Sequence, residues 1–177
     1  MPGAGVGGYI TYPITAEDAA SGFMCGQPDL DRFFAQHAVG NQQTGIGTSF
    51  VLRGTEDGGP RVLGFYTLSM ADVASKQLRK SLKAKLPRYP LPVALIGRLG
   101  VHQDAQGQGV GQRLLGDALR RVHTAAALVG CVGVIVDAKD EAAQRFYERY
   151  GFTVIVSSDW PHRLFLPMGT IAAGLGT

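Results

Sequence analysis

A glycine-rich turn between an apolar stretch and an amphipathic helix restricts the fold of this chain most. Five glycines fall within the fifteen residues from Gly97 to Gly111, and leucines at helical spacing follow directly. This pattern predicts a helix from Val110, whose first amides have no intrahelical acceptor and carry the positive end of the helix dipole. Glycines let such amides converge on an anion, so the turn suits a diphosphate. An ordinary helix-entry turn is the alternative.

Two common phosphate-binding loops do not fit this turn. A P-loop closes with Gly-Lys-Ser/Thr, whereas Gly111 is followed by Gln112 and Arg113. A dinucleotide fingerprint reads G-x-G-x-x-G and needs an acidic residue at the end of the next strand at the right distance, and this run meets neither condition. The run instead reads Q-x-x-G-x-G from Gln106 to Gly111.

Composition places the chain among globular proteins with one hydrophobic core. It has 177 residues, of which 45% are hydrophobic and 18% charged, and no apolar run approaches the roughly 20 residues of a membrane span. Cys25 and Cys131 lack metal-site spacing, so we expect no metal and a reducing, cytoplasmic setting, and the start has no secretory signal pattern. We expect a flexible tail over 1–8, one domain over 9–170 and a C-terminal tail over 171–177.

Local patterns predict alternating strands and helices. A helix is expected from Pro28, with Leu30, Phe33, Phe34 and His37 on one face, and a basic helical segment over 74–90. A second helix with an acidic start is expected to end at Gly151. The expected strands cover 9–14, 47–54, 61–70, 92–101, 131–138, 152–158 and 163–168. This order predicts the α/β class, with helices around a mixed sheet.

The order of these motifs resembles the GCN5-related N-acetyltransferases, or GNAT enzymes. The strand "LIGRLGV", the turn Gln106–Gly111, the strand "VGVIVDA" and the helix "AAQRFYERYGF" carry the resemblance over about 60 residues. It implies a mixed sheet splayed between its two central parallel strands, with acetyl-CoA in the gap. The cofactor-binding residues that it implies are Leu99, Gly100, Val101, Gln106, Gly107, Gln108, Gly109, Val110, Gly111, Gln112, Ala138 and Ala143.

The resemblance also implies that Tyr147 is the catalytic general acid. Acetyl transfer to an amine needs a positioned thioester and a proton for the departing thiolate. Tyr147 lies four residues after Ala143, so both share a helix face and the alanine leaves room for a ligand. The spacing alone equally fits a core aromatic residue, like its neighbours Phe146 and Tyr150.

No general base stands out in the sequence. His102, His123 and His162 are candidates by residue type only. A lysine acceptor with a pKa of about 10.4 needs help in losing its proton, whereas an α-amine with a pKa of about 7.7 needs little. The missing base therefore favours an α-amine.

The opening "FMCGQPDLDRFFAQHA" resembles one branch of the family, the toxin acetyltransferases of type II toxin–antitoxin systems. "GFYTLS", "PVALIGRLGV", "VDAKDEAAQRFYERYGF" and "LFLPM" continue the pattern, so it extends from Phe23 to Met168. The branch implies acetylation of the α-amino group of aminoacyl-tRNA, which blocks translation, together with a homodimer and a ribbon-helix-helix antitoxin. His102 stands where the branch usually has Asp, and Gln106 where it often has Arg. Two alternatives are a GNAT enzyme for a small amine or protein amine and a non-catalytic CoA-binding module.

Basic residues are the candidates for tRNA contacts. Six cations without an acid fall within thirteen residues, a pattern that fits either phosphate binding or a solvated helix face. Arg98, inside an apolar strand, needs either a buried carboxylate or the acceptor's phosphate or terminal adenosine. Asp137 lies either beside the acetyl-CoA gap or at a helix entry. The predicted tRNA-binding residues are Lys76, Arg79, Lys80, Lys83, Lys85, Arg88 and Arg98.

Overall fold

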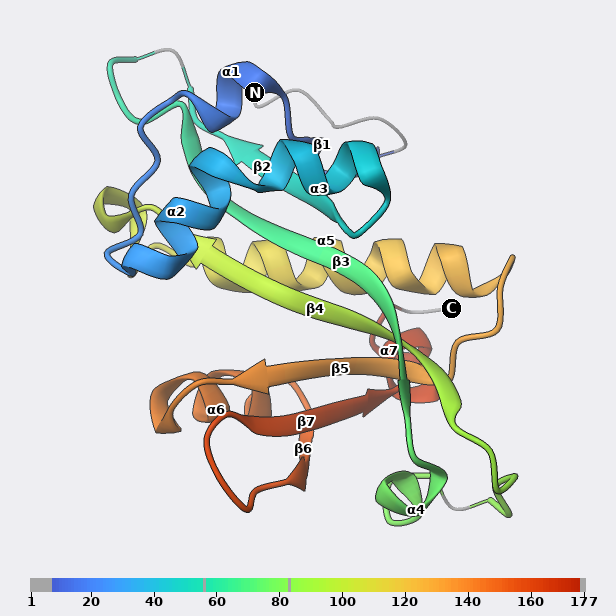
Figure 1. Cartoon of the computed structure of the whole chain (residues 1–177). Coiled ribbons are helices and arrows are strands. Elements are labelled where there is room, and N and C mark those ends of the chain that lie inside the picture. The colour runs from blue at the N-terminus through green and yellow to red at the C-terminus, as the bar shows by residue number, and fades with distance from the viewer. Residues whose placement is uncertain (1–7, 56, 83, 176–177) are drawn as a thin grey trace. The chain divides into compact units, whose positions relative to one another are not determined.

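The computed structural model of the chain describes residues 8–55, 57–82 and 84–175 (Figure 1). Residues 1–7 of the predicted N-terminal tail therefore lie outside the described residues. The predicted C-terminal tail starts within a helix, α7 (Met168–Gly174), whose Ile171 is buried. No helix in the described part of the chain has the length and apolar character to cross a membrane.

One mixed seven-stranded sheet confirms the predicted α/β class. Its hydrogen-bonded order is β1-β2-β3-β4-β5-β7-β6. The strands are β1 (Tyr12–Pro13), β2 (Thr48–Arg53), β3 (Val62–Val73), β4 (Leu91–Val101), β5 (Gly133–Ala138), β6 (Thr153–Val156) and β7 (His162–Pro167). β4 and β5 are parallel, with Ala94 to Ile96 paired to Val134 to Val136, and β4 continues to Val101 beyond the last pair.

The helices agree with the sequence pattern in part. They are α1 (Ala16–Ala19), α2 (Pro28–Gln36), α3 (Ala38–Thr44), α4 (Ser75–Leu78), α5 (Val110–Ala126), α6 (Glu141–Glu148) and α7, with a 3-10 turn at Gln103–Ala105. The α5 and α6 predictions are confirmed, and Gly151 after α6 has the expected left-handed φ of +94°.

Two predicted helices are shorter than expected. His37 leaves helical geometry at φ −123° and ψ −28°, which separates α2 from α3, and its side chain is exposed rather than on the apolar face. Among the described residues of the basic segment, α4 alone is helical. Like charges one turn apart, such as Lys76 and Lys80, repel each other and disfavour a longer helix there. The strand predicted over 9–14 is limited to β1.

Packing divides the chain into two compact units. The first unit comprises residues 1–69 and 97–118, and the second comprises residues 70–96 and 119–177. Strands β3 and β4 and helix α5 each contribute residues to both units.

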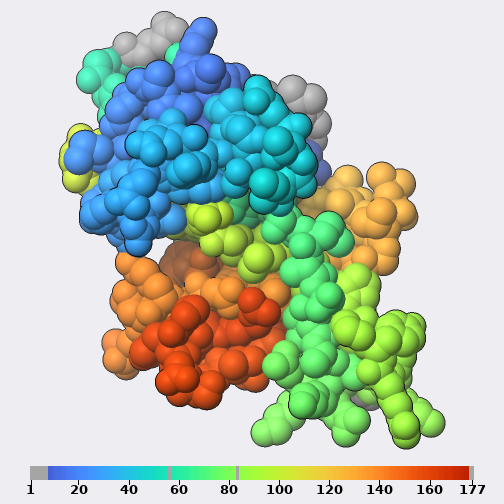
Figure 2. Space-filling view, in the orientation of Figure 1, coloured from blue at the N-terminus to red at the C-terminus, as the bar shows by residue number. Residues whose placement is uncertain are grey.

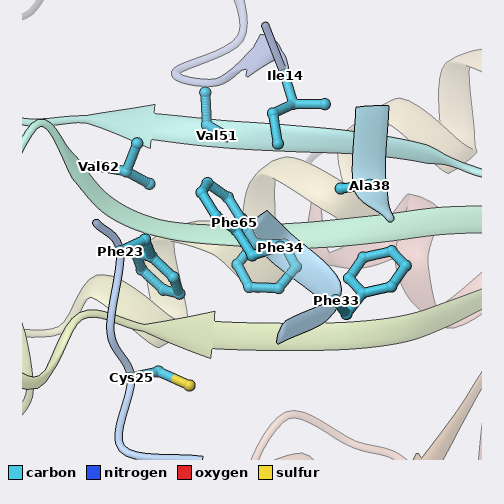
Figure 3. Packing of buried hydrophobic residues seen from close by; sticks show 9 residues of the cluster. All are labelled: Ile14, Phe23, Cys25, Phe33, Phe34, Ala38, Val51, Val62 and Phe65. Atoms are coloured by element: carbon cyan, nitrogen blue, oxygen red, sulfur yellow. The ribbon is translucent and has the colours of Figure 1, made fainter. Parts of the chain in front are cut away.

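The core of the first unit is an aromatic cluster between α2 and β3. The ring of Phe34 lies 4.6 Å from that of Phe23 and 4.9 Å from that of Phe65, measured between centroids. Figure 3 shows Phe34 directed onto Phe65, with Phe33 and Phe23 beside them. Full burial of each such ring contributes roughly 2–3 kcal/mol. Figure 2 shows α2 and α3, in blue to cyan, as a continuous surface of this unit.

The core of the second unit lies between its sheet strands and α4. Its buried members are Val73, Leu78, Leu91, Val93, Ile135 and Phe165. Leu78 is fully buried although it belongs to the basic segment, so α4 packs through its apolar side while Lys76 remains exposed.

The buried carboxylate of Asp18, which no sequence pattern predicted, anchors α1 in the first unit. Asp18 caps α1 together with Thr15, and Arg53 grips its two oxygens at 3.1 and 2.8 Å. Arg61 Nε donates a third bond at 3.1 Å. Burial raises the pKa of Asp18, but the hydrogen bonds from Arg53 and Thr15 outweigh it and lower the pKa to about 2.

We expect Asp18→Asn to lower the free energy of unfolding by about 2 kcal/mol at neutral pH. The folded pKa lies below the unfolded value of 3.8, so this stabilisation is complete above about pH 4 and is lost as the pH falls towards 2. Urea unfolding of the native protein and the variant at pH 7 and pH 3 measures this difference in the free energy of unfolding.

Asp29→Asn is the matched control, because Asp29 is exposed and, among the described residues, its ion pair is with Arg32 on the surface of α2. It should change stability by less than about 0.5 kcal/mol. An Asp18→Asn deficit that does not shrink at low pH would contradict the role of its ionised form.

Candidate functional site

The glycine turn of the first unit presents open backbone at the start of α5. Gly107 and Gly109 have left-handed φ angles of +77° and +78°, which other residues adopt only with strain. A Cβ atom at either position would meet no atom within 4 Å beyond the adjoining residues, so there is open space beside both glycines. The amide of Arg113 donates to the carbonyl of Gly109 at 3.2 Å, and the preceding amides of α5 lack intrahelical acceptors.

Gln106 braces this turn with its side chain. Its Nε2 donates to the carbonyl oxygens of Cys25 at 3.0 Å and Val101 at 3.1 Å. The two bonds tie the turn to the end of β4 and to the segment before α2. Of the other predicted residues, Gly107, Gln108, Gly109 and Gln112 are exposed and Val110 is buried.

His102 serves as a cap rather than as an exposed base. Its Nδ1 accepts the amide of Asp104 at 3.1 Å, and its own amide donates to the carbonyl of Leu63 at 2.8 Å. The imidazole packs against Phe23 at 5.8 Å. An Asp side chain can accept the same amide, so the cap explains how His can replace Asp here.

The ring of Tyr147 is buried in the second unit, but its hydroxyl is accessible. Its ring packs edge-on against Phe146 at 5.1 Å and Phe152 at 5.4 Å, and the residue is 9% exposed. No described residue bonds the hydroxyl, yet the only fully buried unpaired side-chain polar atom in the described residues is Ser21 Oγ. The Tyr147 oxygen therefore keeps contact with solvent.

Burial raises the pKa of Tyr147 to about 12. The phenol thus stays protonated at neutral pH, as a proton donor must. The sequence offered a core role and a general-acid role as alternatives, and the buried ring with an accessible hydroxyl is compatible with both. Ala143, on the same face of α6, is half-buried, and Ala138 at the end of β5 is buried.

Asp137 forms a cross-strand ion pair. Arg163, its partner in the β5–β7 register, donates to its two oxygens at 2.8 and 2.9 Å. The helix-entry role that was one alternative for Asp137 belongs to Asp140, whose Oδ1 accepts the amide of Ala143 at 2.9 Å.

Cations of the basic segment line two pockets of the second unit. Lys76 and Lys80 line a pocket of about 810 Å³, where Ser81 and Thr153 bond each other at 3.1 Å. Lys76 also lines a pocket of about 470 Å³. Arg79 and Arg88 share this second pocket, Lys85 is exposed, and Lys83 lies outside the described residues. Figure 2 shows the segment, in green to yellow-green, at the surface of this unit.

None of the described cations of this segment has a carboxylate partner among the described residues. They are therefore available to an anion. Arg98, in the first unit, likewise has no carboxylate among the described residues. Its guanidinium lies 3.7 Å over the ring of Phe33, and burial lowers its pKa. The buried-carboxylate alternative for Arg98 is therefore wrong.

Cysteine and metal chemistry find no support in the described residues. Burial, with a hydrogen bond involving Asp31, raises the pKa of Cys25 to about 11, so its thiol is not activated. Cys131 donates its thiol to the carbonyl of Gly133 at 3.3 Å. Among the described residues no group of three His, Cys, Asp or Glu side chains could hold a metal ion.

Comparisons with known proteins agree on one family. An acetyltransferase (GNAT) domain model matches residues 56–154. A tRNA-acetylating toxin of Mycobacterium tuberculosis is 34% identical over 163 residues, which cover 92% of this chain and 94% of the toxin.

Two solved structures extend the comparison. AtaT complexed with acetyl-methionyl-tRNA has a TM-score of 0.81 at 30% identity and covers 94% of this chain and 98% of its own. A Tyr-to-Phe mutant of the AtaT toxin, bound to the C-terminus of the antitoxin AtaR and to acetyl-CoA, has a TM-score of 0.75 at 27% identity. It covers 94% of this chain and 98% of its own.

We expect the Tyr147 phenol to ionise later than an ordinary tyrosine. Subtracting the ultraviolet titration of Tyr147→Phe from that of the native protein isolates its tyrosinate band. Because burial raises its pKa to about 12, no band should form below about pH 11.

The same subtraction in urea-unfolded protein is the control and should show the band near pH 10. A band near pH 10 in the folded protein as well would mean that the ring is not buried in solution.

Proposed function

The chain belongs to the GNAT family of acetyltransferases, and we propose that it acetylates the α-amino group of aminoacyl-tRNA and so blocks translation. The observation that carries this proposal is the identity of 34% to a tRNA-acetylating toxin over nearly the full length of both chains. AtaT, similar over 94% of this chain, was solved with acetyl-methionyl-tRNA, an aminoacyl-tRNA with an acetylated amino acid.

The glycine turn is suited to the diphosphate of acetyl-CoA. Left-handed Gly107 and Gly109 expose the backbone, and free space surrounds both positions. Backbone amides at the start of α5 can donate to diphosphate oxygens, aided by the helix dipole. We assign the remaining predicted contacts to β4 around Leu99 to Val101 and to Ala138 and Ala143. Acetyl-CoA supplies the thioester acyl group, and no metal takes part in the proposal.

Tyr147 is assigned as the general acid. When the amine nitrogen bonds to the thioester carbonyl carbon, the carbon–sulfur bond breaks and the sulfur takes a proton from the phenol. The nitrogen releases one proton to solvent, and solvent reprotonates the phenol. The phenol is protonated at neutral pH because burial raises its pKa. The pKa of the phenol exceeds that of a free thiol, about 8.5. The hydroxyl therefore donates its proton while the carbon–sulfur bond breaks and negative charge develops on sulfur.

No general base is assigned among the described residues, and an α-amine acceptor is compatible with this. The Nδ1 of His102 already accepts the amide of Asp104, so the neutral ring carries its proton on Nε2. An α-amine with a pKa of about 7.7 is substantially neutral at physiological pH and needs no strong base.

Partners follow from the same assignment. The unpaired cations of the basic segment can neutralise tRNA phosphates, and Arg98 is a further candidate. We include a homodimer and a ribbon-helix-helix antitoxin in the proposal, since a similar toxin was solved with its antitoxin AtaR. Charged tRNA as the proposed substrate supports a cytoplasmic location, which we include in the proposal.

We expect radiolabelled acetyl-CoA and bulk charged tRNA to give labelled tRNA that loses its label on mild alkaline deacylation. Tyr147→Phe should bind acetyl-CoA normally and turn over at least about ten-fold more slowly, because only the proton donor is removed. Calorimetry and initial rates measure the two quantities.

Label that stays on deacylated tRNA, or that enters only protein, would overturn the proposed substrate. Full turnover by Tyr147→Phe would leave the substrate standing and remove only the general acid.

We expect the double variant Lys76→Glu with Lys80→Glu to bind tRNA at least about ten-fold more weakly, with a shallower salt dependence, because phosphate contacts are lost. Filter binding at several salt concentrations measures both effects.

The matched control is Arg32→Glu with Arg120→Glu, which changes the net charge equally at exposed positions outside the segment. Equal losses in both double variants would show that net charge, not this segment, governs tRNA affinity.

A further inference from the structure

Trp160, the only tryptophan of the chain, presents one ring face to solvent. It is 47% exposed, although large aromatic side chains usually bury most of their surface. Its other face lies on the imidazole of His162, with ring centroids 3.5 Å apart and planes 9° from parallel. One face of the indole therefore packs on His162, and the other face is exposed to solvent.

Contacts within the second unit hold this stack in place. His162 Nδ1 bonds Gln144 Oε1 at 2.7 Å, and His162 is paired in register with Ala138 at the end of β5. The neighbouring Arg163 is fixed by its two bonds to Asp137. The indole therefore rests on a side chain that is itself anchored to helix and sheet.

The anchor of the stack lies on the helix of the assigned general acid. Gln144 precedes Tyr147 by three residues on α6, so their side chains are neighbours on one helix face. The hydroxyl of Tyr147 remains accessible to solvent. The stacked pair and the phenol are thus linked through a single helical turn of α6.

An open indole face of this kind is typical of nucleobase binding. Bases stack on aromatic side chains in single-stranded nucleic acids regardless of base identity. In aminoacyl-tRNA the reacting α-amine is joined through one ester to the ribose of the terminal adenosine, so that base stays near the reacting atoms. In acetyl-CoA the adenine is at the opposite end of a long molecule from the thioester.

We propose that Trp160, seated on His162, is a stacking platform for the terminal base of the acceptor tRNA. The inference rests on the proposed function and deepens it by assigning a contact for the 3′ end. His162 and Gln144 are positioning residues, because they act through the indole.

Intrinsic fluorescence tests the platform directly, since all tryptophan emission comes from Trp160. Uncharged tRNA is titrated into the full-length protein, in parallel with the same tRNA lacking its 3′-terminal adenosine, and filter binding of the same samples gives the complex formed. We expect the intact tRNA to quench the emission strongly and the shortened tRNA to leave most of it.

Three outcomes overturn the assignment. Equal quenching by both tRNAs, or none by either, excludes the terminal base. Quenching by acetyl-CoA alone assigns the indole to the donor instead.

Kinetics of variants supply the second measurement. Trp160→Ala should raise KM for aminoacyl-tRNA about ten-fold at unchanged acetyl-CoA affinity, whereas Trp160→Phe keeps most of the affinity because a ring remains. KM for an amino-acid ester without a nucleoside should not change. Leu128→Ala, at another exposed apolar side chain of the second unit, is the matched control.

The results separate the two proposals. A wild-type protein that acetylates aminoacyl-tRNA, with unchanged KM in Trp160→Ala, removes the platform alone. Absence of aminoacyl-tRNA acetylation in the wild type removes the proposed function. A Trp160→Ala variant with an altered oligomeric mass would make Trp160 a subunit contact and contradict the platform.

Discussion

The left-handed backbone at Gly107 and Gly109 is the constraint on which the proposed acetyl-CoA site depends. Only glycine adopts these φ angles without strain, and they carry the chain from the end of β4 into α5. Gln106 secures the turn by bonding two carbonyls, so the amides at the start of α5 are presented on a braced loop. A rigid array of donors binds a diphosphate without the entropic cost of ordering a flexible one.

Tyr147 joins structure and proposed chemistry in one side chain. Its ring packs against Phe146 and Phe152, and the burial that stabilises the fold also raises the pKa of the phenol. A protonated hydroxyl is thereby maintained on α6. The stack of Trp160 on His162 is anchored one turn earlier on the same helix. In the second unit, α6 thus carries both the proposed general acid and the support for the proposed acceptor contact.

Several features could not be predicted from local patterns because they depend on residues distant in the chain. The break at His37 does not disturb the apolar spacing that predicted one helix. The carboxylate of Asp18 meets Arg53 and Arg61, 35 and 43 residues away, so no motif marks it. The exposed face of Trp160 and the partner of Asp137 likewise depend on how β5, β7 and α6 pack. The guanidinium of Arg98 lies over the ring of Phe33, a contact between residues far apart in the chain that no local pattern marks.

By itself, the sequence determined the alternation of strands and helices, the glycine turn and the acid-capped helix with its tyrosine, because periodicity, glycine conformation and capping act within a few residues. Only the tertiary structure decided which cations remain unpaired, which hydroxyl reaches solvent and which aromatic faces stay open. Burial and ion pairing are properties of neighbours brought together by packing, and a linear pattern does not contain them.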